Sequence, residues 1–240
     1  MKPFVKTQKK ITDKVAENIY WVGTYWPEIQ GSLNSFLLID EKVALIDTGA
    51  IPTGGTILEN IKKHIDPAKV EYIIATHSCV DHVGGLSTLL GAMKNVKIIG
   101  HPYLKLVLQM YYGHQVPFVP APEGANISLG KMNLWFLPPM FLDAWDTLYV
   151  FESENRVLFS ADTFCNGPKE WTLFAKNDIK DEIRTFHTVK FPATSLGDRK
   201  KLLRAAQALK ELKPKILASG HGLLLNKDIS SYIDTMAEVL

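Results

Sequence analysis

The sequence predicts an α/β fold in which two stacked sheets are covered by helices on their outer faces. One observation behind this expectation is the order of segments along the chain, which runs strands, helix, strand, helix, strands, helix, strand, helix. Another is that 240 residues, 46% of them hydrophobic, suffice to bury a full core as one large domain or two small ones. This order of strands and helices is compatible with a two-sheet sandwich. The order alone does not select the topology; the sequence motifs described below do.

Short apolar segments rich in β-branched and aromatic residues predict the strands, and segments with apolar residues every three or four positions predict the helices. Asp66-Pro67 ends the first helix, because proline disfavours a helical conformation in the residue before it. The Pro-rich residues 117–122 are expected to be irregular. The expected strands are residues 18–22, 34–39, 43–46, 70–75, 96–99, 134–137, 148–151, 157–159 and 216–218, and the expected helices are residues 57–65, 86–93, 103–112, 199–212 and 230–240.

The composition argues against several classes of partner. The formal net charge of +2 gives no electrostatic basis for binding nucleic acid or an acidic membrane. No apolar run approaches the roughly 18 to 20 residues that span a bilayer, and the charged N-terminus lacks the apolar segment of a secretory signal. Cys79 and Cys165 do not make a disulfide framework. We therefore expect a cytoplasmic protein with neither nucleic-acid nor membrane partners.

The strongest chemical feature is the segment His77-Ser-Cys-Val-Asp-His82, which directly follows the expected strand 70–75 and precedes Gly84-Gly85. Two imidazoles, a thiol and a carboxylate lie together at a strand end, where a loop lets side chains converge on one point. These groups are ligand types for zinc, and imidazole with carboxylate also suits non-haem iron. The segment therefore predicts a metal site.

Four motifs in chain order resemble those of the metallo-β-lactamase superfamily. They are the loop 76–85 (Thr-His-x-x-x-Asp-His-x-Gly-Gly), residues 44–49 (Ala-Leu-Ile-Asp-Thr-Gly), residues 158–162 (Leu-Phe-Ser-Ala-Asp) and residues 218–222 (Ala-Ser-Gly-His-Gly). The resemblance implies an αββα sandwich, with two stacked mixed sheets and helices outside. It also implies that Asp47 supports the site, that Asp162 bridges two metal ions, and that His221 is the last histidine ligand.

The sequence around the motifs narrows the resemblance to the flavodiiron proteins. The similar stretches are residues 19–23, 32–39, 41–48, 134–150 and 157–164. Flavodiiron proteins carry a C-terminal flavodoxin domain that binds FMN, but only 19 residues (240 − 221) follow His221. The standalone relatives are the oxygen-binding diiron proteins. The resemblance therefore implies a single metallo-β-lactamase-like domain over residues 1–240, with no flavodoxin domain and no FMN in this chain.

The same resemblance implies two metal positions that share the bridging Asp162. The other ligands are His77, Cys79 and Asp143 at position one, and Asp81, His82 and His221 at position two. The family has the pattern His-x-Glu-x-Asp-His in the loop and a further histidine before the bridging aspartate. Here Cys79 stands at the place of the glutamate and Asp143 at the place of that histidine, so both departures fall at position one.

The two departures change the chemistry that we expect of position one. A thiolate from Cys79 is a softer donor than glutamate and favours zinc or a thiolate-ligated iron. Asp143 has a shorter reach than histidine and adds a negative charge. We expect two iron ions as cofactors, or one if position one is empty, with zinc as the alternative metal.

Three functions are compatible with these ligands. The first is a flavodiiron-like oxidoreductase or sensor that binds or reduces dioxygen or nitric oxide and uses an external electron donor or signalling partner. The second is a zinc-dependent metallo-hydrolase, in which zinc lowers the pKa of a bound water. The third is a degenerate, non-enzymatic member that keeps only the fold. Flavodiiron relatives pair head to tail so that the flavin of one chain meets the irons of the other. Without a flavodoxin domain that reason for dimerising is gone, so a homodimer is one possibility among several.

Other residues carry weaker signals. His114 lies on an expected loop and is considered as a residue that lines the pocket, although a plain loop position is the simpler interpretation. Cys165 is expected to be a packed thiol rather than a metal ligand. Trp145, beside Asp143, is considered as a residue that shapes the pocket, with packing as the simpler interpretation. His101 and His187 have no ligand-like residues beside them in the sequence, so structural roles are expected for both.

Overall fold

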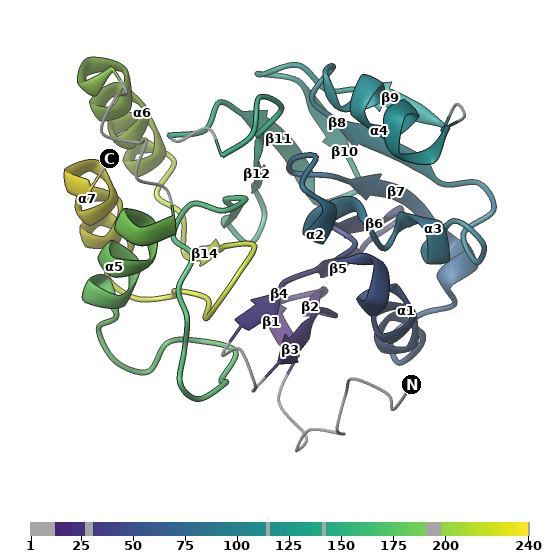
Figure 1. The fold of residues 1–240 in the computed structure, drawn as a ribbon, viewed down its shortest axis with the longest axis horizontal. Helices are drawn as coiled ribbons and strands as arrows, with labels where there is room; N and C mark the ends of the chain where they lie inside the picture. The colour runs from purple at the N-terminus through teal and green to yellow at the C-terminus, as the bar shows by residue number, and fades with distance from the viewer. Residues whose placement is uncertain (1–12, 27–30, 114–115, 141–142, 191–197, 240) are drawn as a thin grey trace.

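The structure, a computed structural model, describes residues 13–26, 31–113, 116–140, 143–190 and 198–239. Two mixed sheets stack on each other across a hydrophobic layer, and helices lie on the outer side of each sheet (Figure 1). The expected α/β sandwich of two stacked sheets with helices outside is confirmed.

The first sheet mixes antiparallel and parallel pairing. In spatial order its strands are β1 (Lys14–Ala16), β2 (Ile19–Trp21), β5 (Phe36–Ile39), β6 (Val43–Ile46), β7 (Val70–Ile74), β8 (Lys97–Gly100) and β9 (Phe118–Pro120). Pairing is antiparallel from β1 to β6 and parallel from β6 to β9. A separate antiparallel pair is formed by β3 (Thr24–Trp26) and β4 (Gly31–Leu33).

The second sheet is antiparallel except at one edge. Its strands, in spatial order, are β10 (Asn126–Ser128), β11 (Asn133–Leu137), β12 (Tyr149–Glu152), β13 (Val157–Phe159) and β14 (Ile216–Ala218). The pair β13 and β14 is parallel. Each of the two sheets therefore has parallel neighbours whose carboxyl ends point the same way.

Helices cover the two outer faces and enclose two further hydrophobic clusters (Figure 1). Beside the first sheet lie α1 (Gly54–Lys62), α2 (Val80–Val83), α3 (Leu86–Leu89) and α4 (Leu104–Tyr112), with the 3-10 turns η2 (Ile51–Thr53) and η3 (Pro67–Lys69). Beside the second sheet lie α5 (Lys180–Lys190), α6 (Arg199–Glu211) and α7 (Ile229–Val239). Among the residues that the structure describes, no helix is both long and apolar enough to cross a bilayer.

Strand β6 illustrates how the sequence buries both faces of the first sheet. All four of its residues are buried. Ala44 and Ile46 belong to the layer between the sheets, and Val43 and Leu45 belong to the layer beneath the helices. Successive side chains of a strand point to opposite faces, so an uninterrupted apolar run is what a strand covered on both sides requires.

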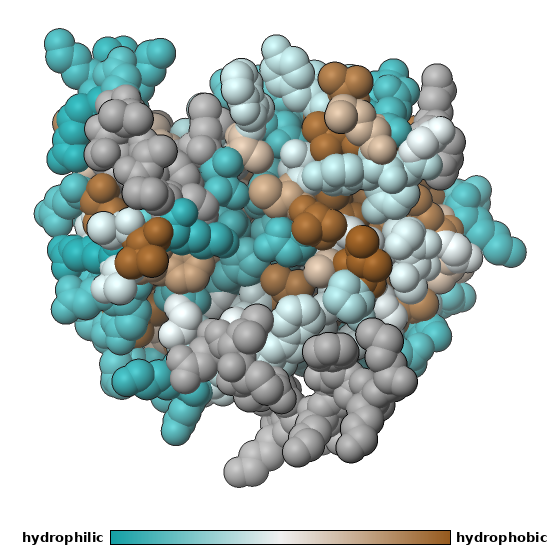
Figure 2. All heavy atoms as spheres, viewed as in Figure 1, coloured by the Kyte–Doolittle hydropathy of each residue, from teal (hydrophilic) through white to brown (hydrophobic). Residues whose placement is uncertain are grey.

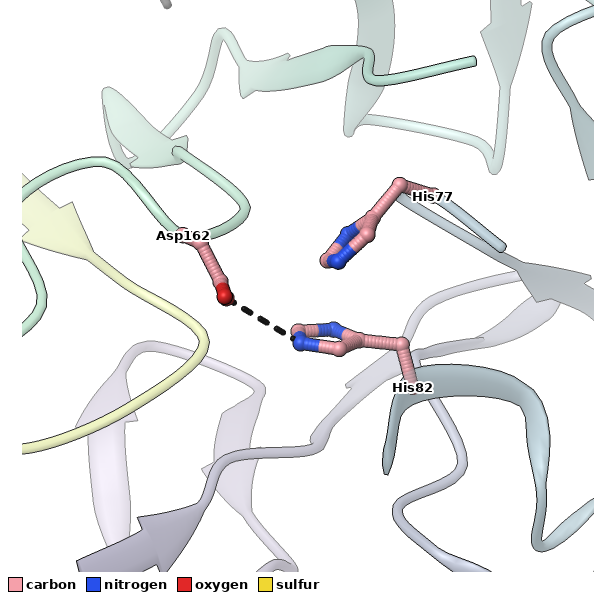
Figure 3. A group of neighbouring side chains, drawn as sticks. All are labelled: His77, His82 and Asp162. Atoms are coloured by element: carbon pink, nitrogen blue, oxygen red, sulfur yellow. Dashed lines mark ion pairs between the residues drawn. The ribbon is translucent and has the colours of Figure 1, made fainter. Parts of the chain in front are cut away.

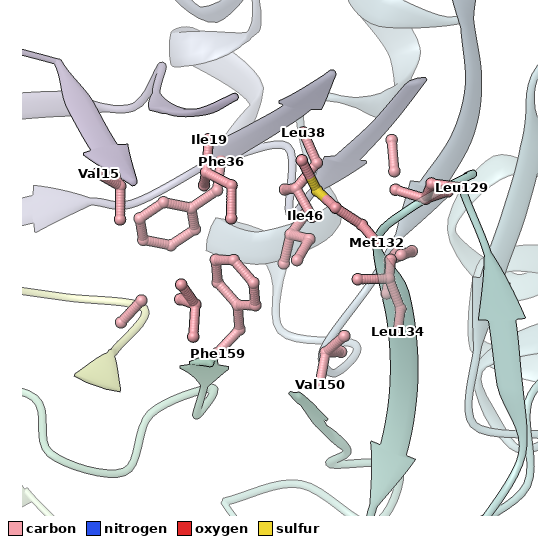
Figure 4. Packing of buried hydrophobic residues seen from close by; sticks show 14 of the residues in the cluster. Val15, Ile19, Phe36, Leu38, Ile46, Leu129, Met132, Leu134, Val150 and Phe159 are labelled. Carbon is pink, nitrogen blue, oxygen red and sulfur yellow. The ribbon is translucent and has the colours of Figure 1, made fainter. Parts of the chain in front are cut away.

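An aromatic pair links the two sheets close to the loops described below. Phe36 on β5 and Phe159 on β13 face each other across the layer (Figure 4), with ring centroids 5.0 Å apart. Their exposed fractions are 2% and 1%. Tilted aromatic pairs combine a large buried area with a favourable ring geometry. Because Phe159 ends β13, the pair also fixes where the following loop begins.

Several elements lie outside the segments expected from the sequence, namely β1, β3, β4, β9, β10, α2 and α5. For β9 and α5 the physical reason is clear. Residues 117–122 were expected to be irregular, but residues 118–120 form β9, which pairs in parallel with β8. Pro120 is tolerated there because β9 is the edge of the sheet. Helix α5 was not predicted at all, since only Ile183 and His187 of its residues are buried.

Replacing Phe159 by alanine should lower the free energy of unfolding by about 3 to 5 kcal/mol, because a fully buried ring is replaced by a cavity between the sheets. Urea-induced unfolding measures this loss. Tyr103→Ala is the matched control: the Tyr103 side chain is 63% exposed, so a change within about 0.5 kcal/mol is expected. Equal losses for the two variants would contradict the role of the inter-sheet layer.

Candidate metal centre

Strand ends from both sheets meet at one edge of the molecule. The parallel strands β6 and β7 end at Ile46 and Ile74, and the parallel strands β13 and β14 end at Phe159 and Ala218. In open α/β sheets, ligands bind beyond the carboxyl ends of parallel strands. The segments just beyond these ends carry Asp47, His77, Cys79, Asp81, His82, Asp162 and His221.

The structure brings together all seven residues predicted as metal ligands. They form three overlapping groups in which the ligand atoms lie within 4.8 Å of one another: His77 with Cys79 and Asp143, Asp81 with His82 and His221, and His77 with His82 and Asp162. Figure 3 shows the last group, in which the ring of His82 points at Asp162 and the ring of His77 lies beside it. The first two groups correspond to the two expected positions, and the third group joins them.

Asp162 lies at the centre of the cluster. Its Oδ1 is 3.1 Å from His82 Nε2 and 3.3 Å from His221 Nε2. His221 Nε2 is also 3.3 Å from Asp81 Oδ2. The carboxylate of Asp162 is almost completely buried, with a side-chain exposure of 3%. Two imidazole nitrogens and two carboxylates therefore surround one small volume at position two.

Position one is built from two neighbouring loops. Asp143 Oδ2 lies 3.3 Å from His77 Nε2 and 3.8 Å from Cys79 Sγ. The loops are tied together by Asp146, whose Oδ1 accepts hydrogen bonds from the backbone N (3.2 Å) and the Oγ (2.9 Å) of Ser78. Sequence reasoning missed Asp146, although its buried carboxylate holds the Asp143 loop against the His77 loop.

Two imidazole rings are oriented by acceptors on the far side from the cluster. His82 Nδ1 lies 2.8 Å from Asp47 Oδ2, and His221 Nδ1 lies 2.6 Å from the carbonyl oxygen of Ser32. Asp47 is itself fixed by the backbone N and the Oγ1 of Thr76, each 2.8 Å away. An acceptor at Nδ1 keeps a proton on that atom, so Nε2 is the ring nitrogen that would bind a metal ion in the cluster. This contact corresponds to the support that the resemblance implied for Asp47.

The donor atoms in the cluster fit a cation. The Nε2 atoms of His77, His82 and His221 are buried, and none has a hydrogen-bond partner among the described residues. Each of them faces carboxylate oxygens, which are acceptors as well. Buried polar atoms are normally paired, so lone pairs that face one another across a small gap are what a metal ion between them would satisfy.

The carboxylates also shift the pKa values of their neighbours. Burial lowers the pKa of His221, but Asp162 and Asp81 outweigh this effect and raise the pKa to about 9. Burial raises the pKa of Asp81, yet the nearby His221 holds that pKa well below its ordinary value. Burial, with the charges of Asp143 and Asp81, raises the pKa of the Cys79 thiol to about 12. A metal ion at position one would therefore have to displace the thiol proton.

Helix α5 brings two further side chains beside the cluster. Lys190 Nζ donates to Asp162 Oδ2 at 3.4 Å. Burial lowers the pKa of Lys190, but Asp162 and Cys165 more than offset this and leave it above the ordinary value. His187 is buried, and burial lowers its pKa to about 4 even though Asp162 opposes the shift, so the ring is neutral near pH 7. Neither residue was predicted to lie beside the cluster, because α5 itself was not predicted.

The weaker candidates have separate outcomes. Cys165 is fully buried, as expected, and its Sγ lies 3.8 Å from Asp162 Oδ1. The expectation that Trp145 packs was wrong: its side chain is 91% exposed. The turn closed by Thr147 Oγ1 with the backbone of Ala144 directs the Trp145 side chain outward. His114 lies outside the described residues.

The stacked sheets and the ligand cluster at their shared edge define a metallo-β-lactamase-like domain. Within this class, the chain belongs to the family described as "ODP family beta lactamase", whose model matches residues 32–222. The match spans the four motifs from Asp47 to His221.

Several relatives are similar over most of this chain. The nitric oxide reductase of Moorella thermoacetica is 25% identical over 93% of the chain, and the chain covers 60% of that protein. The rubredoxin-oxygen oxidoreductase of Megalodesulfovibrio gigas is 30% identical over 55% of the chain and 33% of the relative. The chain thus spans about 60% or less of the length of these curated relatives.

Solved structures show the same fold. The rubredoxin oxygen:oxidoreductase of Desulfovibrio gigas superposes with a TM-score of 0.83 at 21% identity, over 94% of this chain and 60% of that chain. The flavodiiron protein of Giardia intestinalis superposes with a TM-score of 0.82 at 21% identity, over 98% of this chain and 59% of that chain. Each superposition includes nearly the whole of this chain but only a little more than half of the solved chain.

Asp47→Asn should weaken metal binding at position two by about 10- to 100-fold, because it removes the charge that orients and polarises the His82 ring. Competition between the protein and a chelator for zinc measures the affinity. Asp181→Asn is the control, since the Asp181 side chain is 93% exposed on α5. An unchanged zinc affinity for Asp47→Asn would show that the His82 contact does not support the site.

Gly220→Ala should also reduce metal affinity by about tenfold or more, because ligands must be held within a fraction of an ångström. A Cβ at Gly220 would lie 2.5 Å from His82 Cε1 and 2.8 Å from Asp162 Oδ1, so one of these groups must move. Gly55→Ala is the matched control, since its Cβ would meet nothing within 4 Å. Equal zinc affinities for the two variants would contradict the idea that a side chain at position 220 displaces His82 or Asp162.

Proposed function

We propose that this chain holds two metal ions, at least one of them iron, and binds dioxygen or nitric oxide at them. The observation that carries the proposal is the set of three overlapping ligand groups around Asp162, with three buried imidazole nitrogens facing carboxylates. Relatives named nitric oxide reductase and rubredoxin-oxygen oxidoreductase, and a solved structure named as a flavodiiron protein, support iron and a diatomic gas.

The proposed ligands follow the two groups of donor atoms. Asp162 is the shared carboxylate. The remaining ligands are His77, Cys79 and Asp143 at position one, and Asp81, His82 and His221 at position two. Position two contains only imidazole and carboxylate donors, which suit non-haem iron. Position one adds a thiolate, so zinc or a thiolate-ligated iron suits it.

The residues of this chain prepare the centre rather than perform redox chemistry themselves. Iron, when bound, supplies coordination positions and electrons for a diatomic gas. Asp47 and the Ser32 carbonyl hold two imidazole rings with Nε2 toward the metal. Asp146 holds the loop of Asp143 against the loop that carries His77 and Cys79. The protein thus contributes a pre-arranged set of donors.

We place gas binding ahead of gas reduction, because Cys79 and Asp143 alter position one. Reduction needs electrons, and for this we propose an external one-electron donor. The name rubredoxin-oxygen oxidoreductase of one relative supports a rubredoxin in that role. We further propose that residues 1–240 act as one lactamase-like domain.

The proposal is tested by counting iron and zinc in protein purified without oxygen, followed by titration with nitric oxide. We expect two metal ions per chain, including iron, and an absorption band that appears with the gas. Asp162→Asn should hold at most one ion, because this carboxylate is proposed to bridge the two positions; it lies in the ligand group that joins His77 of one position to His82 of the other. Asp178→Asn is the control, since the Asp178 side chain is 62% exposed and pairs with Lys180.

The other outcomes separate the remaining functions. Zinc alone, with turnover of a generic ester and no gas-dependent band, would replace the proposal by a metallo-hydrolase. Absence of any metal would replace it by a non-enzymatic member of the family. Two ions retained in Asp162→Asn would contradict the bridging role of Asp162 while leaving metal binding intact.

A further inference from the structure

Asp162 has different neighbours at its two oxygens. Oδ1 faces the imidazoles of His82 and His221, at 3.1 and 3.3 Å. Oδ2 accepts a hydrogen bond from Lys190 Nζ at 3.4 Å. A lysine cation therefore contacts the same carboxylate that is proposed to join the two metal positions.

Helix α5 places Lys190 beside the cluster. Lys190 is the last residue of the helix, where the helix dipole favours a cation. Its Nζ also lies over the ring of Phe186, 5.2 Å from the centroid, one turn earlier in the helix. The side chain is 43% exposed, so its ammonium group borders both the buried Asp162 and solvent.

The charge count of the centre shows what such a cation changes. Two divalent ions would contribute four positive charges. Asp81, Asp143, Asp162 and a metal-bound Cys79 thiolate contribute four negative charges, which gives a total of zero (4 − 4 = 0). This sum covers only the residues proposed to touch the ions; the carboxylates of Asp47 and Asp146 lie behind them. Lys190 therefore supplies one positive charge at the solvent-facing edge of a site that is otherwise rich in carboxylates.

We propose that Lys190 is a fixed cation of this centre, which draws small anions to the metal ions and in return lowers the affinity of the site for those ions. The inference rests on the proposed function, because it concerns the same site. Like charges repel and opposite charges attract over several ångströms in a partly buried site. A single residue therefore acts on metal binding and on anion binding with opposite signs.

The two opposite signs distinguish this role from a structural one. Lys190→Gln removes the charge and keeps a side chain of similar length. We expect it to bind Co²⁺ several-fold more tightly and the cobalt-loaded protein to bind azide about tenfold more weakly. Lys190→Arg should restore both values toward those of the wild type. If Lys190 only stabilised helix α5, its replacement would weaken the binding of both Co²⁺ and azide.

The experiment is a titration of the metal-free chain with Co²⁺, followed by visible absorption, and then of the cobalt protein with azide. Lys180→Gln is the matched control, since Lys180 is at the opposite end of α5 and pairs with Asp178 at 2.8 Å. Thermal unfolding of each variant establishes that the fold is retained.

Each result has a separate meaning. Tighter cobalt with weaker azide in Lys190→Gln alone supports the role of Lys190. If Lys190→Gln and the wild type bind Co²⁺ and azide with equal dissociation constants, or if the variant binds both more weakly, the role of Lys190 is overturned. The proposed function is unaffected by either result. A wild-type cobalt protein that binds no azide also overturns the role of Lys190. Failure of the wild type to bind cobalt contradicts the proposed function itself, and the Lys190 role with it.

Discussion

Buried negative charge at the shared edge of the two sheets is the constraint on which this structure depends. Asp47, Asp146 and Asp162 are each 2% or 3% exposed, and a buried carboxylate is costly unless it is paired. Asp47 is paired by Thr76 and His82, and Asp146 by Ser78. Thr76 and Ser78 carry no charge, and Asp146 Oδ2 has no hydrogen-bond partner among the described residues, so these contacts hold the carboxylates in place without cancelling their charge. The contact with Asp47 also leaves His82 Nε2 facing inward, and the remaining negative charge favours a cation at the cluster.

The sequence predicted this edge because the responsible residues follow strands. Each of the four motifs comes just after a short apolar run, and parallel strands bring their carboxyl ends together. Ser32 could not be predicted in the same way, since it acts through a backbone carbonyl that any residue would provide. Asp146 was missed because its partner, Ser78, lies 68 positions earlier in the chain.

Helix α5 and strand β9 escaped prediction for different physical reasons. In α5 only positions 183 and 187 are buried, so the apolar pattern is too sparse to stand out, and Thr185, Thr188 and Val189 are β-branched residues that weaken helix propensity. In β9 the prolines indicated irregular chain, but an edge strand needs hydrogen bonds on one side only. Both elements are stable through packing and pairing that local sequence does not encode. Lys190, which depends on α5, was therefore unpredictable too.

The two proposed metal positions differ in how firmly their candidate ligands are held. At position two, His82 and His221 each have an acceptor at Nδ1 within 2.8 Å. At position one, His77 Nδ1 is 3.3 Å from the hydroxyl of Thr76, and Asp143 depends on a loop held by Asp146. Pre-organised ligands lose less freedom on binding. Under the proposed function, position two therefore fills first, and the charge it brings then favours loss of the Cys79 proton at position one.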